Sequence, residues 1–102
     1  MNLATFPRKL VVIITEAAIE QMLARDVLAL GAHGYTISDV RGSGSHGARE
    51  ASWEADRNIR VEVICDEATA DKIAHTMREK YCASYAMSLF IADIGVLRPE
   101  KF

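Results

Sequence analysis

Residues 10–14 form an uninterrupted apolar run, Leu-Val-Val-Ile-Ile, and this run most constrains how the chain folds. Four of its five residues are β-branched, and such a run predicts a strand that is buried on both faces. Lys9 begins the predicted strand, and residues 1–8 form a short polar lead-in. The chain has 102 residues, which is one domain near the small end of what buries a self-sufficient core. Other elements must therefore cover this strand on both sides.

Apolar residues at helical spacing predict two amphipathic helices. Thr15 is a suitable N-cap for the first helix, which ends at Gly31, and Asp66 is a suitable N-cap for the second. The apolar stripe of the first helix comprises Ile19, Met22, Leu23, Val27 and Leu30. The stripe of the second helix comprises Ala70, Ile73, Ala74, Met77 and Tyr81.

Three further strands are predicted. Residues 35–40 form a strand of mixed polarity, and residues 85–94 form the last strand. Residues 58–65 alternate cleanly between apolar and polar positions. The apolar face of that strand comprises Ile59, Val61, Val63 and Cys65. Arg60 and Glu62 point the other way, where a cross-strand charge pair is the expected arrangement.

This order of elements is the ferredoxin-like α+β plan, βαββαβ, in which two helices cover one face of a four-stranded antiparallel sheet. Residues 1–102 then form a single domain, with a long loop at about 42–57 between the second and third strands and a tail at 95–102. Loops of that length inside a small domain are usually functional or mobile. Because the first and last strands are apolar on both sides, the uncovered face is expected to pack against other copies of the chain.

Composition and charge exclude several classes of function. The net charge is −2 and the isoelectric point is about 5.9, so the chain lacks the excess positive charge that nucleic acid requires. No apolar run reaches the roughly 20 residues that span a bilayer, and the N-terminus has no signal-peptide pattern. We therefore expect a cytoplasmic protein. Cys65 and Cys82 have no metal-ligand spacing, and no metal site is expected.

Residues 31–49 hold five of the six glycines in the chain. Glycine-rich loops can present backbone N–H groups to an anion, and Arg49 and His46 are the side chains best suited to hold a phosphate there. A flexible turn with a solvated arginine is the alternative interpretation. No nucleophile, base and orienting residue occur together, so the chain is not expected to be an enzyme.

The order of residues within this stretch indicates a family. The pattern is Gly31-Ala32-x-Gly34-Tyr35-Thr36, a short strand, and then Arg41-Gly42-x-Gly44-Ser45-x-x-x-Arg49. It resembles the start of the nucleotide-binding loop of PII-like signalling proteins, particularly the SbtB-like branch associated with inorganic-carbon uptake and carboxysomes. Flanking segments around Lys9 and Lys80 extend the resemblance over nearly the whole chain.

The resemblance implies a homotrimer that binds an adenine nucleotide in clefts between subunits. Its implied nucleotide-binding residues are Gly34, Tyr35, Thr36, Arg41, Gly42, Ser43, Gly44, Ser45, His46, Arg49, Glu62, Arg98 and Lys101. Gly42 and Gly44 would approach the phosphates, and Gly34, Tyr35 and Thr36 would lie along the ribose and adenine. The alternatives are that Tyr35 is a half-buried aromatic of the strand and that Arg41 caps the strand end. Bicarbonate is implied as a second anion. A bicarbonate transporter or a carboxysome component is the implied partner, with the protein recruited to it from the cytoplasm.

Two departures from the family pattern refine these expectations. No tyrosine lies between Gly42 and Arg60, so the nucleotidylation of classical PII proteins is not expected. The turn at residues 82–87 lacks the lysine that grips the outer phosphates in that family, which favours ADP or AMP over ATP. Trp53, in the long loop, is a candidate anchor for a partner protein, and packing onto its own subunit is the alternative.

Two other classes of protein remain open from the sequence. One is a small ferredoxin-like phosphatase of the acylphosphatase kind, for which Asn58 is the only internal asparagine available. The other is a structural trimer that resembles metal-tolerance proteins of similar fold, which would bind copper and no nucleotide.

Overall fold

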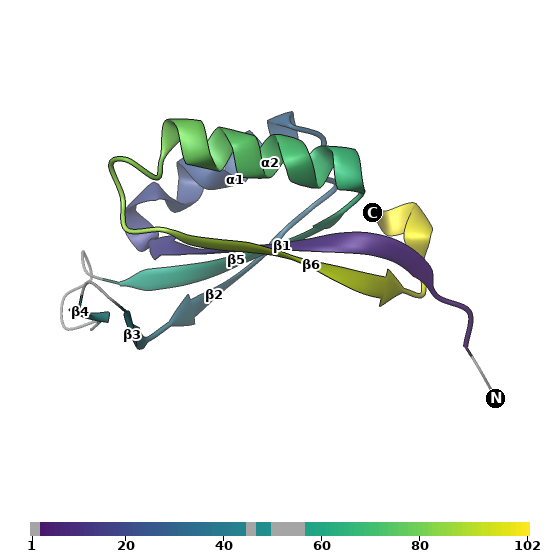
Figure 1. Cartoon of the computed structure of the whole chain (residues 1–102), viewed down its shortest axis with the longest axis horizontal. Coiled ribbons are helices and arrows are strands. Elements are labelled where there is room, and N and C mark those ends of the chain that lie inside the picture. The colour runs from purple at the N-terminus through teal and green to yellow at the C-terminus, as the bar shows by residue number, and fades with distance from the viewer. Residues whose placement is uncertain (1–2, 45–46, 50–56) are drawn as a thin grey trace.

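The computed structural model describes residues 3–44, 47–49 and 57–102, and its main elements follow the predicted βαββαβ order (Figure 1). Four antiparallel strands form the main sheet in the order β2-β5-β1-β6. These strands are β1 (Phe6–Glu16), β2 (Thr36–Val40), β5 (Asn58–Cys65) and β6 (Ser88–Val96). Helices α1 (Glu20–Ala29) and α2 (Glu67–Lys80) both lie on one face of the sheet (Figure 1). The ferredoxin-like plan is therefore confirmed.

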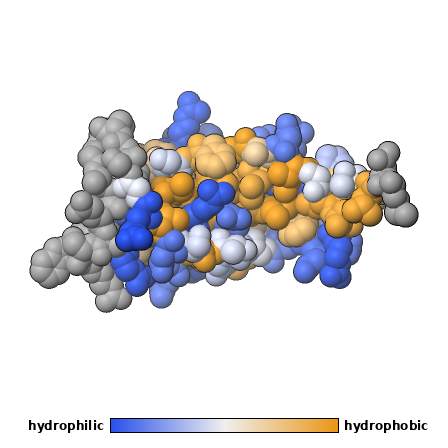
Figure 2. All heavy atoms as spheres, turned by 90° about the horizontal axis from the view of Figure 1, so that it is seen from below, coloured by the Kyte–Doolittle hydropathy of each residue, from blue (hydrophilic) through white to orange (hydrophobic). Residues whose placement is uncertain are grey.

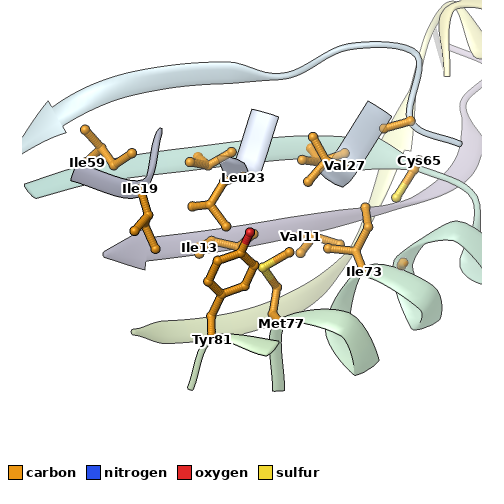
Figure 3. Close-up of a cluster of buried hydrophobic side chains, with 14 residues drawn as sticks. Val11, Ile13, Ile19, Leu23, Val27, Ile59, Cys65, Ile73, Met77 and Tyr81 are labelled. Carbon is orange, nitrogen blue, oxygen red and sulfur yellow. The ribbon is translucent and has the colours of Figure 1, made fainter. Parts of the chain in front are cut away.

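The hydrophobic core fills the space between the sheet and the two helices (Figure 3). Alternate residues of β1 and β5 meet the apolar stripes of α1 and α2 there, and for β5 the alternation of the sequence predicted this. The buried cluster comprises Val11, Ile13, Ile19, Leu23, Val27, Ala32, Ile59, Val61, Val63, Cys65, Ala70, Ile73, Met77 and Tyr81. Each large apolar side chain buried in this way contributes about 1.5–3 kcal/mol. Over the opposite face of the sheet, which we call the open face, lies no helix of the described residues (Figure 1).

The start of α1 differs from the prediction. Thr15 is not an N-cap, because it belongs to β1 and pairs with Ile59 of β5. Its hydroxyl donates a hydrogen bond to the carbonyl of Ala86 at 3.0 Å. A 3₁₀ helix, Ala17–Ile19, follows the strand, and α1 then begins without a side-chain cap. Sheet pairing thus keeps the backbone extended past the residue whose type suggested a helix start.

The other predicted helix signals are confirmed. Asp66 caps α2, since its side chain accepts a hydrogen bond from the backbone N–H of Thr69 at 2.8 Å. That bond lowers the pKa of Asp66, because it stabilises the ionised carboxylate. Gly31 ends α1 with a φ of 114°, a left-handed conformation that glycine adopts without strain.

The first and last strands of the main sheet are displaced from the predicted bounds. β1 begins at Phe6, which pairs with Val96, so the lead-in is partly strand. β6 begins at Ser88 rather than at Tyr85. The backbone N–H of Tyr85 donates to the carbonyl of Tyr81 at 3.0 Å, so helical turns continue past α2 and delay the strand.

The long loop contains a short ribbon that the sequence did not predict. Strands β3 (Gly42–Gly44) and β4 (Gly47–Arg49) pair antiparallel, with Gly42 opposite Arg49. Gly42 and Gly44 therefore lie in an extended strand, not in a tight turn that gathers backbone N–H groups. The ribbon lies beyond the end of β2, at the left of Figure 1.

A polar cluster joins α1 to the end of α2. The Tyr81 hydroxyl donates a hydrogen bond to Oδ2 of Asp26 at 2.5 Å, and Lys80 Nζ donates to the same oxygen at 2.9 Å. Partial burial acts to raise the pKa of Asp26, but the hydrogen bonds from Tyr81 and Lys80 together lower it. The pKa of Tyr81 is raised, first by burial and then by its bond to Asp26. The ionised carboxylate and the neutral hydroxyl thus stabilise each other.

Candidate functional site

The open face of the sheet is divided into a polar half and an apolar half. Figure 2 views this face and shows a hydrophobic band along the molecule with hydrophilic groups beside and within it. The apolar half is built mainly on β1 and β6 and comprises Leu10, Val12, Ile14, Ile64, Phe90, Ala92 and Ile94. Phe90 is 48 % exposed, so the band includes a large apolar side chain without cover in the single chain.

The polar half lies on β2 and β5. Thr36 pairs with Glu62, and Ser38 pairs with Arg60, so these four side chains share the open face. Arg60 Nε donates a hydrogen bond to Glu62 Oε2 at 2.9 Å. The predicted charge pair therefore exists, but within one strand; the prediction that it joins two strands was wrong. The two side chains stand two residues apart on the same face of β5, and Asp39, the charged residue of β2, pairs with Ile59 and therefore lies on the other face.

The predicted site residues fall into two groups along β2. At its start, Gly34, Tyr35 and Thr36 are exposed, and Thr36 lies beside Glu62. At its end, Arg41 and Gly42 are exposed and lead into the ribbon. The second group also contains Ser43 and Gly44 of β3 and Arg49 of β4. Ser45, His46 and Trp53 lie outside the described residues.

The C-terminal tail folds back onto its own chain near the start of β2. The carbonyl of Lys101 lies 3.1 Å from His33 Nδ1, and Arg8 Nη2 donates to the carbonyl of Pro99 at 3.1 Å. Arg98 forms an ion pair with Glu100 at 3.3 Å. Figure 1 shows the C-terminus at the end of the molecule opposite to the ribbon. Within one chain, Arg98 and Lys101 are therefore not brought together with Arg41, Gly42 and Arg49.

The end of the long loop is tied to the sheet by contacts that the sequence did not indicate. The backbone N–H of Ala17 donates to the carbonyl of Arg57 at 2.8 Å. Glu16, the preceding residue, accepts a hydrogen bond from the backbone N–H of Ala86 at 3.3 Å. Arg57 also approaches Asp39, with an Nη2 to Oδ1 distance of 3.9 Å. The dipeptide Glu16–Ala17 thus contacts Arg57 at the end of the long loop and Ala86 in the turn before β6. No motif in the sequence indicates these contacts.

Asn58 and the cysteines bear on the alternative functions. Asn58 is only 6 % exposed and is paired on both sides in the sheet, which leaves it poorly placed to position an attacking water.

Both cysteines are free thiols, and burial raises the pKa of Cys65 to about 11. Within the described ranges, no group of three or more His, Cys, Asp or Glu side chains is arranged to hold a metal ion. No helix in the described part of the chain is long and apolar enough to cross a membrane.

Comparison with protein families gives one match over most of the chain. The model of the family described as nitrogen regulatory protein P-II matches residues 8–101. The matched region includes the whole of the main sheet from Arg8 onward, both helices and most of the tail.

Solved structures agree with that match. A PII-like signalling protein from Thermus thermophilus is 39 % identical, with a TM-score of 0.85, 98 % of this chain covered and 99 % of the other. A structure of CPII from Thiomonas intermedia bound to ADP and bicarbonate is 27 % identical, with a TM-score of 0.88 and 99 % of each chain covered. Another structure of CPII, bound to ADP, AMP and bicarbonate, aligns at 30 % identity with a TM-score of 0.86, covering 99 % of this chain and 98 % of the other.

Proposed function

This chain belongs to the nitrogen regulatory protein P-II family, and we propose that it is a non-enzymatic sensor that binds ADP or AMP in clefts between the subunits of a homotrimer. Bicarbonate is the second ligand in this proposal. The observation that carries it is the likeness, over almost the full length of both chains, to CPII bound to ADP, AMP and bicarbonate.

The divided open face supports the assembly. Its apolar half leaves Phe90 about half exposed, and covering such a surface favours association of copies of the chain. Its polar half, where Thr36 and Glu62 lie side by side, would stay accessible at the edge of the contact between subunits and could bind a ligand there. The sheet face thus supplies both the surface that subunits bury and the polar margin where a cleft between them would lie.

We propose that the nucleotide lies along β2, with its base toward Thr36 and its phosphates toward Gly42. The base end contains Gly34, Tyr35, Thr36 and Glu62, and the phosphate end contains Arg41, Gly42, Ser43, Gly44, Ser45, His46 and Arg49. Arg41 is exposed at the correct end of the strand for this role. Arg98 and Lys101 would contribute to a cleft formed with a neighbouring subunit.

The choice of ADP or AMP rests on the turn between α2 and β6. Residues 82–87 carry no lysine or arginine, so this turn offers no cation for a third phosphate. Its backbone N–H at Ala86 is already bonded to the Glu16 carboxylate. A nearby carboxylate repels an incoming phosphate, which further disfavours ATP at this turn.

Nucleotide binding would change the arrangement of the loop at 42–57, which we propose as the segment that contacts a partner, with Trp53 as an anchor. A ligand shifts such an equilibrium only by its difference in affinity for the two states. If bicarbonate is the second ligand, a bicarbonate transporter or a carboxysome component is the partner class that fits best. The protein would then be cytoplasmic and recruited to that partner.

Calorimetric titration of the purified protein with AMP, ADP, ATP and cyclic AMP, each with and without bicarbonate, tests the proposal. We expect saturable binding of ADP or AMP. Arg49→Ala should weaken it about tenfold or more, because a hydrogen bond from a charged donor is lost. Arg78→Ala, at an exposed position near the end of α2, is the matched control and should bind as the original chain does.

Two results would count against the proposal. The absence of saturable binding with all four nucleotides would refute nucleotide sensing. Equal nucleotide affinity of the Arg49→Ala and Arg78→Ala variants would be compatible with nucleotide binding. It would refute the assignment of Arg49 to the phosphates.

A further inference from the structure

Two sulfur atoms face each other across the turn between α2 and β6. Sγ of Cys82, which comes two residues after α2, lies 4.0 Å from Sδ of Met87, which directly precedes β6. A metal–sulfur bond is about 2.3 Å long, so two sulfurs bound to one ion are at most about 4.6 Å apart. The observed separation corresponds to an angle of about 120° at such an ion. Both sulfurs can therefore bind one ion in the observed arrangement of the turn.

Backbone hydrogen bonds on both sides of the turn hold the two sulfurs in place. The backbone N–H of Cys82 continues the hydrogen bonding of α2. Ala86, which precedes Met87, is bonded to the end of β1 through both of its backbone groups. Its N–H donates to the Glu16 carboxylate at 3.3 Å, and its carbonyl accepts from the Thr15 hydroxyl at 3.0 Å. The two sulfur side chains are thus anchored on fixed backbone, which lowers the entropy cost of binding an ion.

The sulfur pair lies on the side of the sheet that the helices cover. Met87 packs against the hydrophobic core there, and Cys82 is exposed. The apolar half of the open face consists of residues that point away from this core. Burial of the open face in an assembly therefore does not by itself cover the pair, and an ion can reach Cys82 from solvent.

The surroundings of the pair favour a cation. The turn at 82–87 carries no lysine or arginine, and the Glu16 carboxylate is bonded to it. The thiolate is the form of cysteine that binds metal ions, so Cys82 loses its proton on binding. A monovalent cation, the thiolate and the neutral thioether of Met87 together carry no net charge.

We propose that Cys82 and Met87 bind a soft monovalent metal ion, Cu(I), for which Ag(I) is a chemical analogue. Thiolate and thioether ligands select Cu(I), whereas carboxylate and carbonyl oxygens suit Mg²⁺ and Ca²⁺. Zn²⁺ prefers four ligands, and the described part of the chain gathers no three His, Cys, Asp or Glu side chains for it. Binding replaces the S–H bond of Cys82 with a sulfur–copper bond and releases one proton, without a change of oxidation state.

This site is independent of the proposed nucleotide function. Neither Cys82 nor Met87 is among the residues assigned to the base end or the phosphate end of β2. Copper binding can be measured without any nucleotide, so failure of the metal site and failure of nucleotide binding are distinguishable. Copper binding together with nucleotide binding would also exclude the structural trimer, which would bind no nucleotide.

The experiment is an anaerobic titration of the purified full chain against the coloured Cu(I) complex of bicinchoninate, with ascorbate as the reductant. Loss of colour measures the transfer of copper to the protein. The original chain is compared with Cys82→Ser, Met87→Leu and Met22→Leu. Leucine conserves the volume and the apolar character of methionine and removes its sulfur. Met22 is the matched control, because it is also a partly buried methionine packed against the core.

We expect the original chain to bind one Cu(I) and Cys82→Ser to lose it. Met87→Leu should bind at least about tenfold more weakly, equivalent to about 1.4 kcal/mol, and Met22→Leu should bind as the original chain does. In the original chain labelled with ¹³C at its methionine methyl groups, silver nitrate should move the Met87 signal in a saturable way and leave the Met22 signal in place.

Three results would overturn the proposal. Equal Cu(I) affinity of Met87→Leu and Met22→Leu would show that Cys82 binds copper as a single thiol. An unmoved Met87 methyl signal in the silver titration would exclude the thioether as a ligand, and this measurement is made on the original chain. Displacement of Cu(I) by equimolar Zn²⁺ would refute the selection of a soft monovalent ion.

Discussion

Replacing Tyr81 with phenylalanine removes one hydroxyl from the polar cluster that joins α1 to α2. The ring is only 2 % exposed and packs in the core, and phenylalanine keeps that packing. The change therefore removes the hydrogen bond from Tyr81 to Asp26, which measures 2.5 Å, together with the interaction of the same hydroxyl with Lys80. Its loss leaves the Asp26 carboxylate with Lys80 as its remaining side-chain donor among the described residues.

The expected cost follows from the charge and exposure of Asp26. A hydrogen bond to a charged group contributes about 1.5–3 kcal/mol to stability. The Asp26 side chain is 21 % exposed and keeps its bond to Lys80, so water and Lys80 compensate part of the loss. We therefore expect Tyr81→Phe to lower the free energy of unfolding by about 1.5 kcal/mol, the lower end of that range.

The difference between the original chain and Tyr81→Phe should also depend on pH. The pKa of Asp26 is lowered in the folded chain, so its contribution is present above the unfolded value of about 4 and is lost as the pH falls through the folded pKa. The pKa of Tyr81 is raised, so its contribution is present below about 10 and is lost as the pH rises through the folded pKa. The difference should be largest between these limits.

Urea unfolding at fixed protein concentration measures this effect, since association of subunits would otherwise change the apparent stability. Tyr85→Phe is the matched control, because its ring lies 6.1 Å from that of Tyr81 and its hydroxyl forms no hydrogen bond with the described residues. Equal losses in the two variants would refute the assigned role of the Tyr81 hydroxyl. So would a Tyr81→Phe effect of the same size at about pH 3 and about pH 7.

Three further outcomes are expected. Asp66→Ala removes the cap of α2 and should cost about 1 kcal/mol in urea unfolding, with an unchanged midpoint as the contradicting result. A Cβ at Gly95 would lie 2.9 Å from its nearest neighbour, whereas one at Gly42 would meet nothing within 4 Å. Thermal unfolding should therefore shift down for Gly95→Ala and stay constant for Gly42→Ala. A thiol reagent should label exposed Cys82 and spare buried Cys65, whose pKa is raised to about 11, so two fast thiols in the native chain would contradict the structure.

Local patterns predicted the elements whose bounds depend on local chemistry. The strand Asn58–Cys65 has the bounds that its alternation indicated, because one face meets the core throughout its length. The cap at Asp66 likewise uses a residue three positions away. Thr15 was misassigned because its conformation depends on pairing with Ile59, far away in the sequence. The ribbon at Gly42 was missed because three-residue strands rich in glycine have no detectable period.

The residues of the candidate site are brought together by the register between strands, which sequence patterns do not give. The sequence indicated Thr36 and Glu62 separately, and only the pairing of β2 with β5 places them side by side. Alternation placed Arg60 on the outer face of its strand, but its position over Phe90 depends on β6 being two strands away. A one-residue change of register would move these side chains to the other face, which is why sequence patterns alone did not identify the polar half.

The length of β2 limits which residues of a single chain can contact one nucleotide. Thr36 and Arg41 are five residues apart on an extended backbone, which separates them by about 17 Å. The two ends of the proposed site are thus distinct surfaces, one for the base and one for the phosphates. The tail contacts His33, close to the base end of its own chain. Any contact of Lys101 with the phosphates must therefore be made to a nucleotide held by a neighbouring subunit. Removing the tail should then weaken nucleotide binding only in the assembled protein, a dependence on assembly that a site within one chain would not have.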